Sequence, residues 1–330
     1  MIKIDSKDKK ILYYMLQDSR QSLKTIAKKI GASKEFVVYR VRRLFKEKII
    51  KNYTVYLNVE KLGYIVMFLY YKFENINPII KQEIIDFLKK SKYISYISSI
   101  EGIYDLQIDV LIGHTLEYES LMDEIQKKYH KYLKFQLATT LIRGVLYNYS
   151  FLLNEKINIS SPVEDKWGRS ITPIDELDFK ILQILSQNPR IPTKVIANEL
   201  KTTVTIVSYR IKKMIKLQII HQYSINVDWS KLGFRYFHLR IFLRDYNKKN
   251  PILDYIRKNP FLKRTWKDLF YSGDINCTFL FRNVEKLREF IEDLTLKFPN
   301  AIDKYEFFSS YKIHKDIFMV PKLINIKKVP

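Results

Sequence analysis

Two segments of the chain, 33–46 and 203–216, carry side chains suited to binding a polyanion. The first holds five basic residues and one acid, and the second holds four basic residues and no acid. In the first, Val37, Val41 and Leu44 recur at helical spacing, which predicts a helix with one buried stripe and a basic outer face. Such a helix fits the major groove of duplex DNA, where arginine can pair with guanine edges.

The candidate contact residues are the side chains that lie outside this buried stripe. They are Ser33, Lys34, Glu35, Phe36, Tyr39, Arg40 and Arg43 in the first segment and Thr203, Thr205, Tyr209, Arg210 and Lys213 in the second. A single basic helix face is usually only a solvated surface. Two such helices in the same sequence setting favour DNA binding instead.

That shared setting is an internal repeat. With a shift of 170, residues 4–63 align without a gap to residues 174–233, and 21 of the 60 aligned pairs are identical. Each copy predicts a helix capped by two aspartates, a second helix and the basic third helix. Gly31 closes the turn before the third helix in the first copy, whereas Lys201 stands there in the second. We therefore expect that second turn to be strained or differently shaped.

Apolar and basic residues then alternate in 49–59 and 219–227, which predicts a strand or wing. Beyond it, both halves change to short apolar strands separated by helices. In the first half we predict strands at 64–73, 93–100, 106–112 and 135–146 and helices at 78–91 and 116–132; in the second, strands at 236–243, 262–269, 275–281 and 305–313 and helices at 251–259 and 284–298. The order βαββαβ is that of a ferredoxin-like sandwich, so the predicted fold class is α+β in two tandem repeats.

The domain boundaries follow from these patterns. We expect helix-turn-helix domains at 1–60 and 174–230, ferredoxin-like domains at 61–153 and 231–330, and a linker at 154–173 that is rich in Asn, Ser, Pro and Gly.

One series of residues in the first sixty positions matches a known pattern. The series is Ile4, Asp5, Asp8, Ile11, Leu12, Arg20, Ile26, Ala27, Ile30, Gly31, Ser33, Val37, Arg40, Val41, Leu44, Ile49, Ile50, Tyr53, Leu62 and Gly63. It resembles the helix-turn-helix of the Lrp/AsnC (leucine-responsive/feast-famine) transcription regulators. The resemblance implies a DNA-binding regulator whose ferredoxin-like domains bind ligands and form oligomers.

The same resemblance suggests an effector site. Gly102, Tyr104 and Asp105 are similar to the family's Gly-x-Tyr-Asp turn near the effector pocket, which implies a small-molecule effector such as an amino acid. These residues would equally form a simple hairpin turn, and both interpretations stay open. The second half has only Gly273 and Asp274, without the tyrosine.

Evidence for an enzyme is thin. The sequence has no Gly-rich nucleotide loop, and its five histidines lack metal-ligand spacing, so we expect no catalytic residue, cofactor or metal. The alternative is a tandem sirohaem decarboxylase-like enzyme, because that group resembles the same domain plan. It would need a basic, His-bearing cavity, for which His238, Arg240, Lys263 and Arg264 are the candidates.

Composition agrees with an intracellular nucleic-acid-binding protein. The net charge of +23 favours a polyanionic partner. The richness in Lys, Ile and Asn that an AT-rich genome imposes weakens this argument. The single cysteine, the charged first ten residues and the lack of a long apolar run predict a cytoplasmic protein, neither secreted nor membrane-inserted.

The duplication itself predicts the assembly. Because the resembling family forms homodimers, we expect the two halves of this chain to pack as an internal pseudo-dimer. Lys34, Glu35 and Phe36 stand opposite Val204, Thr205 and Ile206, so the two reading helices should recognise unlike half-sites. Association of whole chains into a homo-oligomer is compatible with this arrangement.

Overall fold

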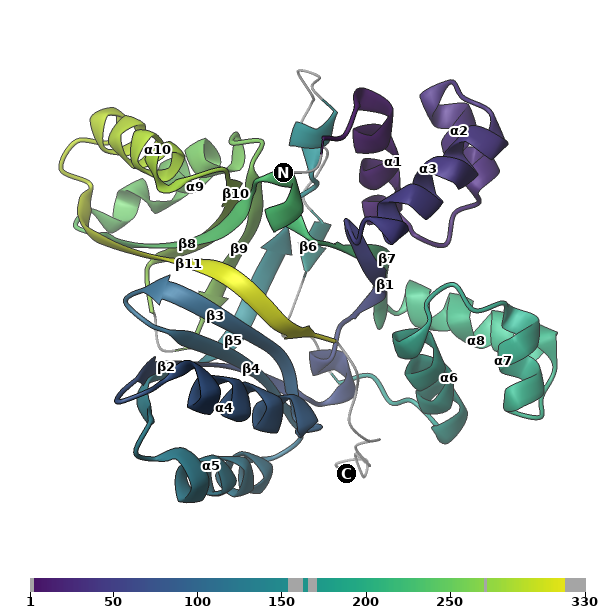
Figure 1. Ribbon diagram of the computed structural model, residues 1–330, viewed down its shortest axis with the longest axis horizontal. Coiled ribbons are helices and arrows are strands. Elements are labelled where there is room, and N and C mark those ends of the chain that lie inside the picture. The colour runs from purple at the N-terminus through teal and green to yellow at the C-terminus, as the bar shows by residue number, and fades with distance from the viewer. Residues whose placement is uncertain (1–2, 154–162, 166–170, 270–271, 318–330) are drawn as a thin grey trace.

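The computed structural model describes residues 3–153, 163–165, 171–269 and 272–317. Two three-helix domains lie on one side of the molecule, and a β-barrel covered by helices lies on the other (Figure 1).

The first helix-turn-helix domain consists of α1 (Ser6–Gln17), α2 (Leu23–Ile30) and α3 (Lys34–Lys46). Asp5 caps α1 by accepting from the backbone N–H of Asp8 at 2.8 Å, and the Asp8 side chain accepts from the backbone N–H of Asp5 at 3.1 Å. This capping box satisfies backbone donors that the helix itself leaves free. Gly31 ends α2 in the left-handed conformation with φ 61°, as its position predicts.

The second domain repeats this arrangement with α6 (Glu176–Gln187), α7 (Thr193–Glu199) and α8 (Val204–Lys216). Lys201 adopts φ 51°, close to the value at Gly31. The residue after each of them donates its backbone N–H to an equivalent carbonyl, Thr202 to Ala197 and Ala32 to Ala27. The turn therefore keeps its shape, and Lys201 carries the strain of a left-handed backbone.

Both ferredoxin-like domains have the predicted βαββαβ order. The first consists of β2 (Ile65–Phe73), α4 (Pro78–Lys90), β3 (Ile94–Gly102), β4 (Leu106–Ile112), α5 (Thr115–Tyr129) and β5 (Leu133–Leu146). The second consists of β8 (Arg235–Leu243), α9 (Lys249–Arg257), β9 (Leu262–Asp268), β10 (Ile275–Phe281), α10 (Val284–Lys297) and β11 (Ile302–Asp316). The predicted elements are confirmed, with most ends within about two residues, the usual scatter of helix and strand boundaries.

The two sheets join into one closed barrel. The strand order is β5-β2-β4-β3 in the first half and β9-β10-β8-β11 in the second. β3 pairs with β11 and β5 pairs with β9, both antiparallel, so the eight strands form a ring without a free edge. Apolar side chains of β2 and β4 pack under α4 and α5, and those of β8 and β10 pack under α9 and α10. The inner faces of both sheets line the barrel.

The strands that follow the helix-turn-helix domains pair with each other. β1 (Ile50–Leu57) and β7 (Ile220–Val227) form a two-stranded antiparallel ribbon in which Tyr53 lies opposite Ile225. Neither strand folds back as a hairpin wing on its own domain. The first helical domain packs on Trp229 and Phe234 of the second half, and the second helical domain packs on Val55 and Leu57 of the first. The helical domains are thus exchanged between the halves.

Most of the predicted linker, at 154–162 and 166–170, lies outside the described residues. Between these ranges, β6 (Val163–Asp165) adds to the sheet by pairing with β5. Among the described helices, none is long and apolar enough to cross a membrane.

Candidate nucleic-acid interface

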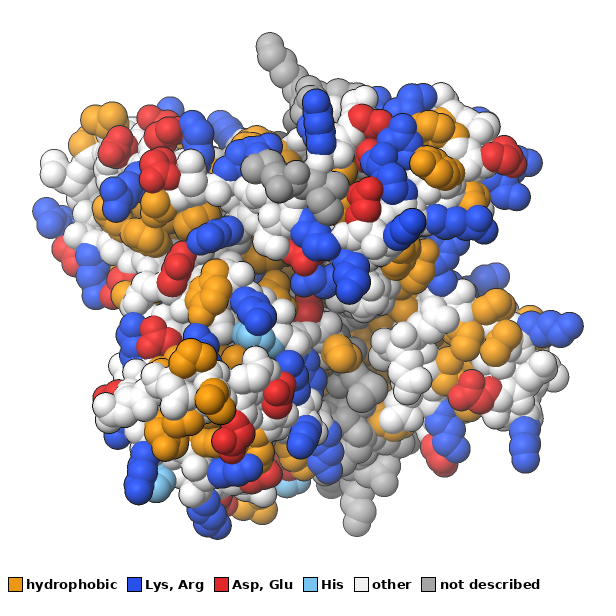
Figure 2. Space-filling view, viewed as in Figure 1, with side chains coloured by type: hydrophobic (Ala, Val, Ile, Leu, Met, Phe, Trp, Pro, Cys, Tyr) orange, Lys and Arg blue, Asp and Glu red, His pale blue; other side chains and the backbone are white. Residues whose placement is uncertain are grey.

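The third helix of the first domain presents one exposed stripe. Glu35, Tyr39, Arg42 and Lys46 follow the spacing i, i+4, i+7 and i+11, and all four are exposed, Tyr39 by 65%. Lys34 is exposed beside them at the start of α3. This stripe lies opposite Val37, Val41 and Leu44, which are buried against the domain core. Lys and Arg side chains gather over this domain in the space-filling view (Figure 2).

The structure corrects the expected position of Arg40 and Arg43. Arg40 pairs with Asp5 at 2.7 Å and with Asp8 at 3.2 Å, and Arg43 pairs with Asp8 and, at 3.8 Å, with Glu47. The Asp8 side chain is fully buried, and the Arg40 side chain is only 19% exposed. A buried carboxylate needs a cation beside it, so these arginines hold α3 to the start of α1 and do not stand on the outer face.

Arg210 is corrected in the same way. Its guanidinium pairs with Asp175 and, at 3.2 Å, with Asp178, whose side chain is 3% exposed. Asp178 keeps a raised pKa, first because burial disfavours its charge and then because Asp175 is near, while Arg210 opposes both effects. The same Asp, Asp and Arg occur in both repeats, which marks the contact as part of the fold.

The third helix of the second domain, α8, offers a different exposed surface. Thr205, Tyr209, Lys212 and Lys216 take the stripe positions, and Lys213 is exposed beside them. At its start, Val204 is 44% and Ile206 is 42% exposed, where α3 presents Lys34 and Phe36. The face of α8 is therefore basic at one end and apolar at the other.

Three of the remaining predicted contact residues have structural partners. Ser33 and Thr203 cap α3 and α8, accepting from the backbone N–H groups of Phe36 and Ile206 at 3.1 and 3.2 Å. Phe36 is half-buried, with the Arg40 guanidinium 4.7 Å from its ring centre. The caps still leave each hydroxyl proton available at a helix N-terminus, where phosphate oxygens are favoured.

Reciprocal contacts fix the two helical domains relative to each other. Lys231 of the second half donates to the carbonyl of Glu47 at the end of α3 at 2.6 Å, and Lys61 of the first half donates to the carbonyl of Leu217 at the end of α8 at 2.5 Å. Both lysines place a cation at a helix C-terminus, where it satisfies a free carbonyl. Arg20 also donates to the carbonyl of Pro189 at 2.8 Å, directly between the two domains.

The three residues of the predicted effector turn make separate contacts. Gly102 has φ 121°, and a Cβ there would lie 3.0 Å from the Phe307 carbonyl oxygen, so glycine permits the approach of β3 and β11. The Tyr104 hydroxyl accepts from Arg240 at 2.9 Å inside the barrel. Asp105 accepts from Lys72 at 3.1 Å and from the backbone N–H of Phe73 at 2.9 Å.

Asp274 of the second half accepts from the backbone N–H of Leu243 at 2.8 Å, the equivalent contact to that of Asp105. The aspartate at this position therefore closes the same turn in both halves, whether or not tyrosine precedes it. This contact accounts for Asp105 without a ligand.

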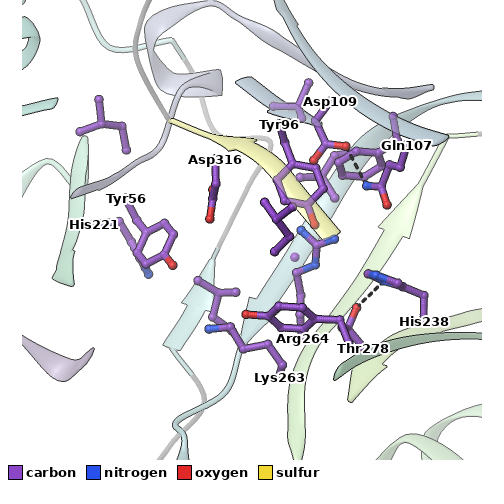
Figure 3. A pocket seen from close by; sticks show the side chains of 18 residues that line it. Tyr56, Tyr96, Gln107, Asp109, His221, His238, Lys263, Arg264, Thr278 and Asp316 are labelled. Carbon is purple, nitrogen blue, oxygen red and sulfur yellow. Dashed lines mark hydrogen bonds between the residues drawn. The ribbon is translucent and has the colours of Figure 1, made fainter. Parts of the chain in front are cut away.

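The basic residues that sequence reasoning named inside the second half come together in the barrel. His238, Lys263 and Arg264 line an interior cavity of about 150 Å³, together with Asp109 from the first half and Asp316 from β11 (Figure 3). Arg240 lies outside the cavity lining and is buried among the rings of Tyr70, Tyr104 and Phe308. In the described part of the chain, no cluster of three or more His, Cys, Asp or Glu residues is arranged to hold a metal ion.

Comparison with known proteins agrees with the helical domains described above. Residues 4–44 match the profile of the AsnC-type helix-turn-helix domain, and residues 174–221 match a winged helix-turn-helix DNA-binding profile. The transcriptional regulator LrpB of Bacillus subtilis is 34% identical over 142 residues, which cover 42% of this chain and 89% of LrpB. This chain belongs to the Lrp/AsnC family. LrpA of Pyrococcus horikoshii is 44% identical over 61 residues, or 18% of this chain and 43% of LrpA.

The fold of nearly the whole chain, with both halves, also resembles a solved enzyme structure. The siroheme decarboxylase NirDL aligns with a TM-score of 0.60 over 94% of this chain and 93% of its own, at 13% identity. Identity this low shows a common fold and leaves function to be argued from the site.

The contact residues that we predicted from the sequence did not include four exposed cations of the two third helices, Arg42, Lys46, Lys212 and Lys216. A helical projection contains the signal, because Arg42 and Lys46 lie three and seven positions after Tyr39, on the same face. The identity of Asp5, Asp8 and Arg40 in both repeats was likewise a sign of a structural contact.

Proposed function

We propose that this chain is a transcription regulator that binds duplex DNA as an intramolecular pseudo-dimer, with α3 and α8 each entering a major groove. The observation that carries the proposal is the reciprocal anchoring of the two helices. Lys61 of one half and Lys231 of the other hold the ends of α8 and α3, and each helix presents an exposed stripe with Tyr and Lys at matching positions. A pair of reading helices held in fixed relation is what a two-part operator requires.

The proposed operator has two unlike halves. The charged start of α3, with Lys34 and Glu35, favours hydrogen-bonding contacts to base edges, whereas Val204 and Ile206 at the start of α8 favour apolar contact with thymine methyl groups. The half-sites should be spaced by about one helical turn of DNA or a multiple of it.

Selection of bound sequences from random duplexes at defined salt, followed by footprinting, tests this proposal. Arg42→Ala should weaken protection of one half-site and Lys212→Ala the other. A palindromic footprint that both variants weaken equally would overturn the assignment of unlike halves, and the absence of any selected sequence would overturn DNA recognition.

A small-molecule effector at the turn of Gly102, Tyr104 and Asp105 is part of the proposal, supported by the resemblance of these residues to the family's turn. Thermal unfolding with a panel of amino acids tests it, with Asp274→Asn as the matched control for Asp105→Asn. Higher assembly of whole chains, which we also propose, is tested by light scattering coupled to size-exclusion chromatography.

A second candidate is a sirohaem decarboxylase-like enzyme. In its favour are the fold shared with NirDL and a cavity that contains His238, Lys263 and Arg264. The cavity by itself, at about 150 Å³, is smaller than the roughly 300–1,000 Å³ of pockets for drug-sized ligands, so a tetrapyrrole would have to extend into the neighbouring groove of about 460 Å³. A visible absorption titration with sirohaem decides the matter: a shifted Soret band lost in His238→Ala would favour the enzyme.

A further inference from the structure

The barrel interior contains a cavity built by both halves of the chain. Tyr56 and His221 enter it from the β1–β7 ribbon, Tyr96 and Asp109 from the first sheet, and Arg264 from the second (Figure 3). Its size is comparable to that of an apolar protein cavity of about 150 Å³ known to hold benzene, which corresponds to a ligand of roughly six to nine non-hydrogen atoms.

Arg264 is a cation of the cavity lining, and its charge acts on the nearby carboxyl of Asp109. Its guanidinium stacks on Trp266 at 4.9 Å and on Phe68 at 5.6 Å, and it extends into the cavity toward Tyr96 (Figure 3). It forms no hydrogen bond or ion pair with any residue that the structure describes. Because burial raises the pKa of Asp109 to about 7, this carboxyl is protonated below that pH and no longer balances the partly buried Arg264, so the cavity is then suited to an anion.

The other basic side chains of the lining do not serve the same purpose. Lys263 also lines the cavity, but its ammonium lies 4.0 Å from the ring centre of Tyr149, and burial lowers its pKa to about 7. His238 Nδ1 is hydrogen-bonded to Thr278 at 3.0 Å and Nε2 to Ser310 at 3.2 Å, and burial followed by nearby arginines lowers its pKa to about 3, so it stays neutral. Among the basic lining residues that the structure describes, Arg264 is therefore the one best placed to pair with an anionic ligand.

The remaining walls are largely apolar or carry carboxyl groups. Val66, Leu141 and Leu146 line the cavity beside Phe68. The Asp109 carboxylate accepts from Gln107 at 2.8 Å, and burial raises its pKa to about 7. Burial also raises the pKa of Asp316 to about 6. Below about pH 6 both carboxyls can hold a proton and donate a hydrogen bond, so they do not repel an anion there.

A neighbouring groove borders the cavity. It encloses about 460 Å³ and shares Tyr56, Lys263 and Asp316 with the cavity. Lys51 and Lys89 also line it, and they pair with Asp228 at 3.6 Å and with Asp86 at 3.0 Å.

We propose that this cavity binds a small monocarboxylate, with its carboxylate on Arg264 and its hydrocarbon part beside Phe68 and Leu141. The site is separate from the turn of Gly102, Tyr104 and Asp105. Because Tyr56 and His221 belong to the ribbon that supports both helical domains, an occupied cavity contacts the element between them.

Calorimetric titration of the full chain with 4-methylpentanoate tests the proposal, with 4-methylpentanamide as the uncharged control. We expect the acid to bind at least ten-fold more tightly than the amide, and more tightly at pH 6 than at pH 8. Arg264→Gln should weaken binding at least ten-fold, whereas Arg244→Gln, an exposed arginine, should leave it unchanged. Leu146→Trp fills the cavity without altering charge and should also weaken binding of the acid. It therefore provides the test if Arg264→Gln fails to fold.

A parallel titration with L-leucine separates a plain acid from an amino acid. The ammonium group would pair with ionised Asp109, so its binding should instead strengthen above pH 7 and weaken in Asp109→Asn. Binding that is lost in Asp105→Asn but kept in Arg264→Gln would place the ligand at the turn and overturn the proposal. Equal binding of acid and amide, or no binding of either at millimolar concentration, would also overturn it.

Discussion

The roles of Arg40 and Arg42 separate folding from DNA contact within one helix. Arg40 binds the fully buried carboxylate of Asp8 and the half-exposed carboxylate of Asp5, whereas Arg42 is exposed on the stripe. A hydrogen bond to a buried charged group contributes about 1.5–3 kcal/mol, and an exposed ion pair contributes less than about 1 kcal/mol. Because Arg43 still holds Asp8 when Arg40 is removed, we expect Arg40→Ala to cost about 2 kcal/mol of stability.

For the first helix-turn-helix domain, which has about 60 residues, such a loss of stability lowers the unfolding temperature by on the order of 10 °C. Arg42→Ala should leave the unfolding temperature nearly unchanged. In DNA titrations at several salt concentrations, Arg42→Ala should lower the slope of log K against log [salt] by about 1, because one phosphate contact releases about one counterion. Arg40→Ala, measured well below its unfolding temperature, should keep the slope and the affinity.

Matched changes in the second half provide the control, since Arg210 and Lys212 take the equivalent positions. Arg210→Ala should lower the unfolding temperature without changing the slope of log K against log [salt]. Lys212→Ala should lower that slope and leave the unfolding temperature nearly unchanged. The reasoning is refuted if Arg40→Ala unfolds within about 2 °C of wild type while lowering the salt slope by about 1, because the ion pairs would then be dispensable for the fold and exchanged for phosphate.

Three further predictions concern the fold and the cavity. Lys201→Gly should stabilise the chain by up to about 1 kcal/mol, since it relieves a left-handed lysine, and Gly31→Lys should destabilise it by about 1–2 kcal/mol, with denaturant titration as the measurement. Lys231→Met should lower the unfolding temperature and loosen α3, seen as faster amide exchange near Glu47. Burial raises the pKa of Asp109 to about 7, so the unfolded state loses this proton first, and the free energy of unfolding should fall as pH rises from about 4 to 7. Burial lowers the pKa of Lys263 to about 7, so the free energy of unfolding should rise again only above that pH. Asp109→Asn should therefore flatten the fall in the free energy of unfolding between about pH 4 and 7.

Much of the fold was predictable because its signals are local. Helical and alternating apolar periodicity identified the helices and strands of both halves, and the aspartate caps and Gly31 marked helix ends. Lys201 was predicted to be strained or to reshape its turn, and only the backbone distinguished the two, since the surrounding helices hold the turn in place. The site was less predictable, because the partner of Arg40 lies 32 residues away at Asp8 and depends on how α3 crosses α1.

The sequence by itself determined that the chain consists of two copies of one unit and that each copy carries a basic third helix. Repetition, periodicity and capping are properties of residues near one another along the chain. Only the tertiary structure decided which side chains of those helices stay exposed, that each helical domain packs on the other half, and that Arg264 meets Asp109 in one cavity. The contacts between the halves join residues more than a hundred positions apart, and they exist because the two sheets bury their edges by closing one barrel.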